Sequence, residues 1–179
     1  MVFPYYENLS AEQQAVYRKS DAASELHLPS VAATEPLVRE LREALKGEQT
    51  ASVQRACSRL CKELCRQFHV EELSVRVLAS RPSSAEGELH GLYIREEGRL
   101  PRITVWMRTA KKSKVVAFKT FLRTLLHEVL HHLDYTLLEL EDSYHTEGFF
   151  RRESHLMRQM LGDEAADKPL PKGQMGFEF

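Results

Sequence analysis

The chain has 179 residues, of which 42% are hydrophobic and 28% are charged, and its formal net charge is −1 at pH 7. These values are typical of a globular protein and exclude collagen-like, strongly disordered and disulfide-scaffold classes. The near-zero net charge gives no basis for binding a polyanion through bulk charge. The sequence contains no apolar run of membrane-spanning length, and its start does not have the basic and apolar regions of a secretory signal.

Three cysteines, Cys57, Cys61 and Cys65, occur in one short segment, and an odd number so close together does not form a disulfide framework. Together with His69 they recur every four residues on a predicted helix. Each step of four drifts about 40° around a helix, so these four side chains cannot all reach one ion. We therefore predict that the cysteines are small buried core residues of a cytoplasmic protein in a reducing compartment.

The hydrophobic pattern changes twice along the chain, from a helical period to a strand period and back. Ser10 and Gln13 form a capping-box pattern at the start of the first helix. The two strands that precede the fourth helix are predicted to pair as a hairpin. Helices are predicted over 11–24, 35–46, 50–68, 114–140 and 148–161, and strands over 73–79, 89–94 and 102–107.

This order of elements predicts an α+β fold with a small, mainly antiparallel sheet preceded by N-terminal helices. We expect residues 1–68 to form a helical segment that covers the sheet within the same domain. The helix over 114–140 is expected to lie against the other side or the edge of the sheet. The polar, Pro- and Gly-rich residues 163–179 predict a flexible C-terminal tail.

The most informative segment is His127-Glu128-Val129-Leu130-His131, an HExxH motif on the long predicted helix. Histidines four residues apart lie on one helix face, so both rings can reach a single Zn²⁺ ion. Glu128 lies about 100° around the helix from His127, beside the metal rather than bound to it. There it can act as the general base toward a metal-activated water.

The helix that carries the motif is amphipathic, with an apolar back and a polar front that includes the two histidines. Two surface histidines on such a helix are the simpler interpretation, but a helix that lines a metal site needs this same division. Asp134 lies on the polar front, where it either accepts a ring N–H of a zinc-bound histidine or is a solvated carboxylate. His132 points away from His131 and is not predicted to be a ligand.

A catalytic zinc site needs a third protein ligand and one open position. His145 is the favoured candidate, because it lies in a predicted turn after the helix that can bring the chain back over the polar front. Glu153, on the last predicted helix, is the alternative. His155 and Glu147 are weaker candidates.

The HExxH motif, followed by His145 and by Phe149 four residues later, resembles the short zincin domains of the SprT-like and WLM metallopeptidases. The hairpin before the motif is similar to the strands that precede the zinc helix in those groups. The resemblance covers residues 70–161. It departs at Thr146, since those groups often have Gly or Asp directly after the third histidine, and this leaves the subfamily and the substrate open.

The resemblance implies that residues 69–162 are a zincin-like metallopeptidase core with a three-histidine zinc site. Its ligands would be His127, His131 and His145, and its substrate would be a peptide or a protein. Zincins often bind substrate by adding a strand to the sheet beside the zinc helix, and the segment 102–107 could supply that edge.

A competing hypothesis is a zinc-containing binding module with little or no hydrolytic activity. Residues 99–123 include eight basic and no acidic side chains, a stretch that could dock nucleic acid or a protein partner. However, Trp106 is the one aromatic residue within the basic run before Phe118, which does not favour stacking on bases. Glu128 also favours the peptidase, since a purely structural zinc site has no need of a base.

Overall fold

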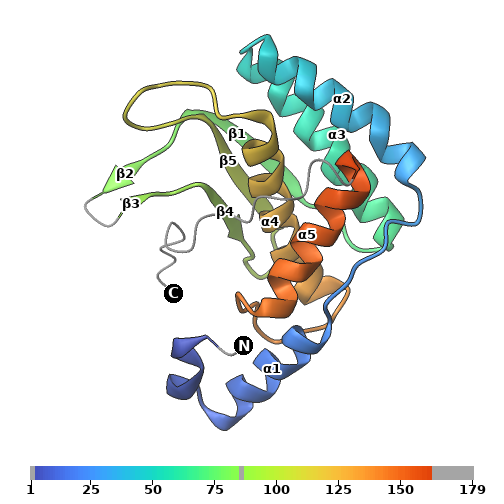
Figure 1. Ribbon diagram of the computed structural model, residues 1–179, viewed down its shortest axis with the longest axis vertical. Helices are drawn as coiled ribbons and strands as arrows, with labels where there is room; N and C mark the ends of the chain where they lie inside the picture. Colours follow the sequence, from blue (N-terminus) through green and yellow to red (C-terminus); the bar gives the residue numbers. More distant parts are fainter. Residues whose placement is uncertain (1–2, 85–86, 163–179) are drawn as a thin grey trace.

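The computed structural model describes residues 3–84 and 87–162, so the predicted tail at 163–179 lies outside the described residues. The elements are η1 (Pro4–Asn8), α1 (Ala11–Ala22), α2 (Val31–Lys46), α3 (Thr50–Phe68), β1 (Ser74–Ser80), β2 (Ser83–Ser84), β3 (Gly87–Glu88), β4 (Gly91–Ile94), β5 (Arg102–Arg108), α4 (Phe118–Thr136) and α5 (Glu147–Leu161). Three N-terminal helices, a small sheet and two further helices confirm the predicted α+β class (Figure 1). None of the described helices has the length and apolarity that crossing a membrane requires.

The main sheet has three strands in the order β1-β5-β4. The pair β4 and β5 is antiparallel, which confirms the predicted hairpin, but β5 runs parallel to β1. The sheet is therefore mixed rather than mainly antiparallel, because the alternation of apolar residues does not encode strand direction. Since β5 is paired on both sides, the expectation that 102–107 offers a free edge is wrong. Among the described residues, β4 is an edge strand of this sheet.

The outer edge of β1 is paired with a side chain of α3. The Gln54 Nε2 atom donates to the Val75 carbonyl at 2.7 Å, and the Val77 amide donates to Gln54 Oε1 at 2.7 Å. One side-chain amide therefore satisfies two backbone groups that an edge strand would otherwise expose.

A single hydrophobic cluster joins one face of the sheet to α2, α3, α4 and α5. Alternate residues of β5, namely Ile103, Val105 and Met107, are buried in this cluster, as is Val77 of β1. Helix α3 packs on β1, and α4 packs on β4 and β5. Both helices bury residues in the cluster that contains Val77, Ile103 and Val105, so they lie on the same face of the sheet. Of the two placements expected for α4, the opposite side of the sheet is therefore wrong, whereas α4 does contact the edge strand β4. The sequence pattern identifies which strand residues are buried but not which helix covers them.

The three cysteines are buried core residues, as predicted. Cys57, Cys61 and Cys65 are buried on the inner side of α3, and none forms a disulfide. Burial raises the pKa of all three thiols. The thiolate needed for nucleophilic or metal chemistry is thereby disfavoured.

Helices α4 and α5 lie side by side through the middle of the molecule, and the end of α1 packs against the start of α5 (Figure 1). Gly148 permits this close approach, because a Cβ atom there would lie 2.3 Å from the Asp21 carbonyl oxygen. The Gly148 amide also donates to Asp21 Oδ1 at 2.8 Å. This packing fixes α5 beside the helix that carries the HExxH motif.

Candidate metal centre

Three histidines that are apart in the sequence bring one ring nitrogen each to a common point. His127 and His131 lie one turn apart on α4, and His145 lies in the turn between α4 and α5. The His145 Nε2 atom is 3.0 Å from His127 Nε2 and 3.1 Å from His131 Nε2. His127 is buried and the other two are partly buried. This is a three-histidine group that could hold a metal ion.

The spacing and chemistry of the group fit zinc. Nitrogens bound to one tetrahedral Zn²⁺ at about 2.0–2.1 Å are about 3.3 Å apart, a few tenths of an ångström more than the separations seen here. Burial holds the pKa of His131 well below its usual value and lowers that of His145 to about 3, with the charge of His127 as the next cause in both. These two rings are therefore neutral near pH 7, the form in which imidazole binds a metal.

An aromatic side chain packs beneath the three rings. The Phe149 ring centroid lies 4.9 Å from that of His127, 5.0 Å from that of His131 and 5.2 Å from that of His145. Phe149 is fully buried. Phe149 therefore closes one side of the group with an apolar surface, which limits the directions that the rings can take.

Glu153 lies behind the His127 ring rather than at the common point. Its Oε2 atom is 2.9 Å from His127 Nδ1, and its Oε1 atom is 3.4 Å from Arg123 Nη1. An ionised carboxylate only accepts hydrogen bonds, so the Nδ1–H of His127 donates and the lone pair of its Nε2 faces the other histidines. Glu153, which the sequence offered as the alternative third ligand, is thus placed to orient His127 in this geometry.

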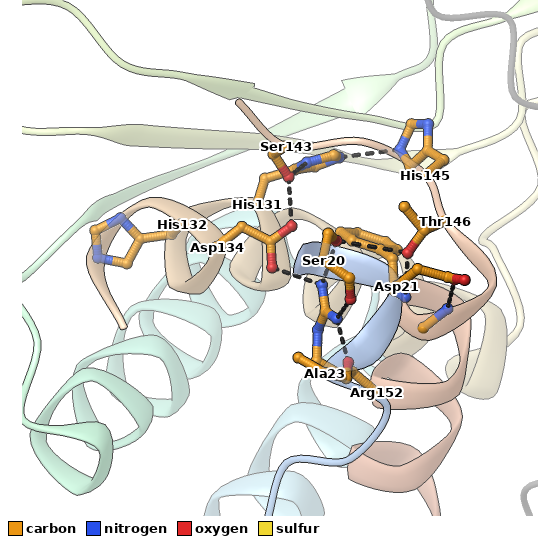
Figure 2. A network of polar contacts seen from close by, with 12 residues as sticks. Ser20, Asp21, Ala23, His131, His132, Asp134, Ser143, His145, Thr146 and Arg152 are labelled. Atoms are coloured by element: carbon orange, nitrogen blue, oxygen red, sulfur yellow. Dashed lines mark hydrogen bonds and ion pairs between the residues drawn. The ribbon is translucent and has the colours of Figure 1, made fainter. Parts of the chain in front are cut away.

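His131 is oriented by a longer chain of hydrogen bonds (Figure 2). Its Nδ1 atom lies 2.7 Å from Ser143 Oγ, and this hydroxyl donates to Asp134 Oδ2 at 2.8 Å. Because the hydroxyl hydrogen is used toward Asp134, Ser143 accepts the Nδ1–H of His131, and the Nε2 lone pair is again directed at the group. Asp134 therefore reaches the histidine through Ser143 and not directly.

The chain of hydrogen bonds continues through Arg152 to the end of α1. Arg152 is fully buried and donates to Asp134 Oδ1 at 2.7 Å. It also donates to the carbonyl oxygens of Ser20, at 2.6 Å, and Ala23 (Figure 2). These are carbonyls of the kind that a helix C-terminus leaves without internal partners. The same guanidinium therefore joins α1 to the residues behind His131.

Glu128 lies beside the group and is not part of it. Its side chain is buried against Gly91 of β4, where a Cβ atom would come within 2.3 Å of Glu128 Oε1. Burial raises its pKa to about 7, although the charge of His127 and a backbone hydrogen bond from Tyr93 act in the opposite direction. A carboxylate with this pKa can exchange a proton near neutral pH.

The weaker candidates Glu147 and His155 lie away from the common point, as does His132, which was not predicted to be a ligand. His132 is buried and points away from His131 and His145 (Figure 2). Its Nε2 atom lies 2.9 Å from the Glu71 carbonyl, and its Nδ1 atom lies 3.1 Å from the Tyr93 hydroxyl. Glu147 pairs with Arg151 at 2.6 Å on the surface. His155 lies in a different cluster of side chains, on the outer side of α5.

The sequence analysis did not identify Ser143, Arg152 or Gly91. A glycine inside a predicted strand signals a close approach by another group, so Gly91 could have been identified. Ser143 and Arg152 have no such signal, because their roles depend on contacts between α4, α5 and α1.

Comparisons with known proteins identify no relative. No protein-family profile matches the chain, and neither a curated protein nor a solved structure matches it. The likeness to SprT-like and WLM metallopeptidases therefore rests on the motif residues alone. The structure adds the convergence of His127, His131 and His145, which is compatible with a metal site.

Proposed function

We propose that the protein is a zinc-dependent metallopeptidase in which His127, His131 and His145 hold Zn²⁺ and Glu128 is the general base. One observation carries the proposal above the others: a buried carboxylate lies next to three converging histidines without being one of their group. A structural zinc site would gain nothing from this carboxylate, whose burial without a metal is unfavourable.

Each residue has a defined task in this proposal. When bound, zinc supplies Lewis-acid activation of a water and of the substrate carbonyl. Glu128 accepts a proton at its carboxylate and then returns it to the leaving amine. Glu153 and Ser143 keep the Nε2 lone pairs of His127 and His131 directed at the ion.

The edge of β4 is the position that we propose for the substrate backbone. Gly91 places this strand directly against Glu128, and β4 is an edge strand within the described part of the chain. A peptide that pairs with such an edge gains affinity from main-chain hydrogen bonds. Its cleavage would therefore depend weakly on substrate sequence.

The binding-module alternative is less well supported by the basic stretch at 99–123. Arg99, Arg108 and Arg123 form ion pairs with glutamates, and Arg123 is buried. Three of the eight predicted positive charges are therefore at least partly neutralised. If the protein is a nucleic-acid-binding module, its affinity for nucleic acid should fall steeply as the salt concentration rises. The rate of peptide hydrolysis should not show this steep dependence on salt.

The proposal is tested with Glu128→Gln in the full-length protein. We expect this variant to retain about one zinc per chain and to lose hydrolysis of an unfolded protein substrate, because an amide cannot accept the proton. His145→Ala is the companion variant and should lose zinc. Undiminished turnover by Glu128→Gln would remove Glu128 from the base role, and a wild-type protein that takes up no zinc would overturn the proposal.

A further inference from the structure

A second group of metal-ligating side chains lies on the outer surface, apart from the three histidines. It consists of Glu25 and His27, from the linker between α1 and α2, and His155 of α5. One ligand atom from each residue lies within 4.8 Å of the other two. The Nε2 atom of His27 is 3.4 Å from Glu25 Oε2, and the two imidazole rings meet edge to face with their centroids 4.6 Å apart.

The side chains of the linker alternate between the core and the surface, and this alternation directs Glu25 and His27 outward. Leu26 and Leu28 are buried, whereas Glu25, which precedes Leu26, and His27, which lies between the two leucines, are exposed. The Gln159 side chain fixes this extended segment to α5: its Nε2 donates to the Leu26 carbonyl at 2.7 Å, and the Leu28 amide donates to its Oε1 at 2.8 Å. His27 is therefore held on both sides.

The same clamp places the third member. His155 lies one helical turn before Gln159 on α5, so it faces the outward side of the clamped linker. Its Nδ1 atom is buried and has no hydrogen-bond partner within residues 3–84 and 87–162. A buried polar atom without a partner is costly, and a bound cation together with a rotation of the ring would relieve that cost.

We propose that Glu25, His27 and His155 form a second divalent-metal site, which takes zinc-like ions and joins the α1–α2 linker to α5. Two imidazoles and one carboxylate are a ligand set that suits zinc, and they leave one position for water. The exposed side chains of Glu25 and His27 can close the remaining separation by changing rotamer. Because the ligands are surface residues with Arg158 nearby, the site is weaker than the three-histidine group.

The function of this site is to restrain the linker. The linker follows Ala23, whose carbonyl accepts from Arg152, and α5 carries both Arg152 and Glu153. An ion shared between linker and α5 would add a third connection to the two hydrogen bonds of Gln159. Hard cations such as Mg²⁺ and Ca²⁺ prefer all-oxygen ligands and are not expected to bind here.

The test is a zinc titration of metal-depleted, full-length protein against a chromogenic chelator. Wild type is expected to bind two zinc ions, one more weakly than the other. His27→Asn should lose the weaker ion only, and His145→Asn the tighter ion only. His69→Asn is the matched control, since His69 is exposed and lies outside both groups, and it should still bind two.

Hydrogen exchange supplies a second measurement. Zinc should slow exchange of the amides of residues 23–30 in wild type and in His145→Asn, but not in His27→Asn. One bound ion in wild type, with His27→Asn indistinguishable from it in both measurements, would overturn the second site. Two ions in wild type that both survive His145→Asn would instead contradict the three-histidine site.

Discussion

The Nδ1 atom of His127 lies 2.9 Å from Glu153 Oε2, and both side chains are buried between α4 and α5. Because of this contact, the two ring nitrogens of His127 have different partners. Glu153 holds the Nδ1–H, and the Nε2 atom faces His145 at 3.0 Å. A carboxylate that orients a metal-binding histidine raises its basicity and fixes its tautomer.

An orienting role for Glu153 predicts a graded effect on zinc affinity. Glu153→Gln retains an oxygen that accepts from His127 Nδ1, so we expect zinc affinity to fall about 10- to 100-fold without loss of stoichiometry. His145→Gln should abolish high-affinity binding. Competition with a chelator measures both. Glu153→Gln also removes the partner of the buried Arg123, so chemical denaturation should show a lower free energy of unfolding. Equal losses of zinc in the two variants would favour Glu153 as a ligand.

Ser143→Ala tests the hydrogen bonds behind His131. The variant removes the acceptor for His131 Nδ1 and leaves Asp134 held by Arg152. We expect zinc affinity to fall about 10-fold or more while the free energy of unfolding changes by about 1 kcal/mol. Ser143→Thr keeps the hydroxyl and should restore most of the affinity. If neither variant changes zinc affinity, the hydroxyl does not orient the histidine.

Gly91→Ala tests the close contact between β4 and the proposed base. The added Cβ would come within 2.3 Å of Glu128 Oε1, so the carboxylate must move. We expect the rate of hydrolysis to fall at least about 10-fold, while the zinc content is retained. Gly47→Ala is the control, because its Cβ meets nothing closer than 3.5 Å at ordinary helical geometry. Full activity of Gly91→Ala would mean that the position of Glu128 is not critical.

The metal-free protein should lose stability in mild acid. The pKa of His145 is lowered to about 3 and that of His131 well below its usual value by burial, so between these values and about 6.5 the unfolded chain binds protons that the folded chain does not. Their contribution to the free energy of unfolding is complete above about 6.5 and decreases as the pH falls below it. Glu128, with its pKa raised to about 7, acts in the opposite direction between about 4.5 and 7.

Urea unfolding of metal-free protein from neutral pH down to about 5 measures this dependence. We expect a net decrease in the free energy of unfolding, by at most about 1.4 kcal/mol per pH unit for each titrating group. His145→Asn should flatten the decrease. Glu128→Gln should steepen it, since the opposing group is removed. A wild-type curve that is flat or that rises toward acid would show that the histidines are not held neutral.

Local features of the fold were predictable from the sequence. The bounds of α3 at Thr50 and Phe68 agree with the prediction, as does the capping box of Ser10 and Gln13 at the start of α1. Capping and helical periodicity involve residues within a few positions of each other, so they are readable without the fold. The parallel pairing of β1 with β5 was not predictable in this way, because strand direction is set by how the chain crosses the sheet.

In the candidate site, too, local features could be predicted from the sequence and contacts between distant segments could not. The spacing of four residues already places His127 and His131 on one face of a helix with Glu128 beside them, because this geometry is local to the helix. The positions of His145 beside them and of Glu153 behind His127 could not be predicted in this way, because both depend on α5 packing against α4. Ser143 and Arg152 likewise acquire their contacts only when distant segments meet, and no local pattern in a sequence encodes such a meeting.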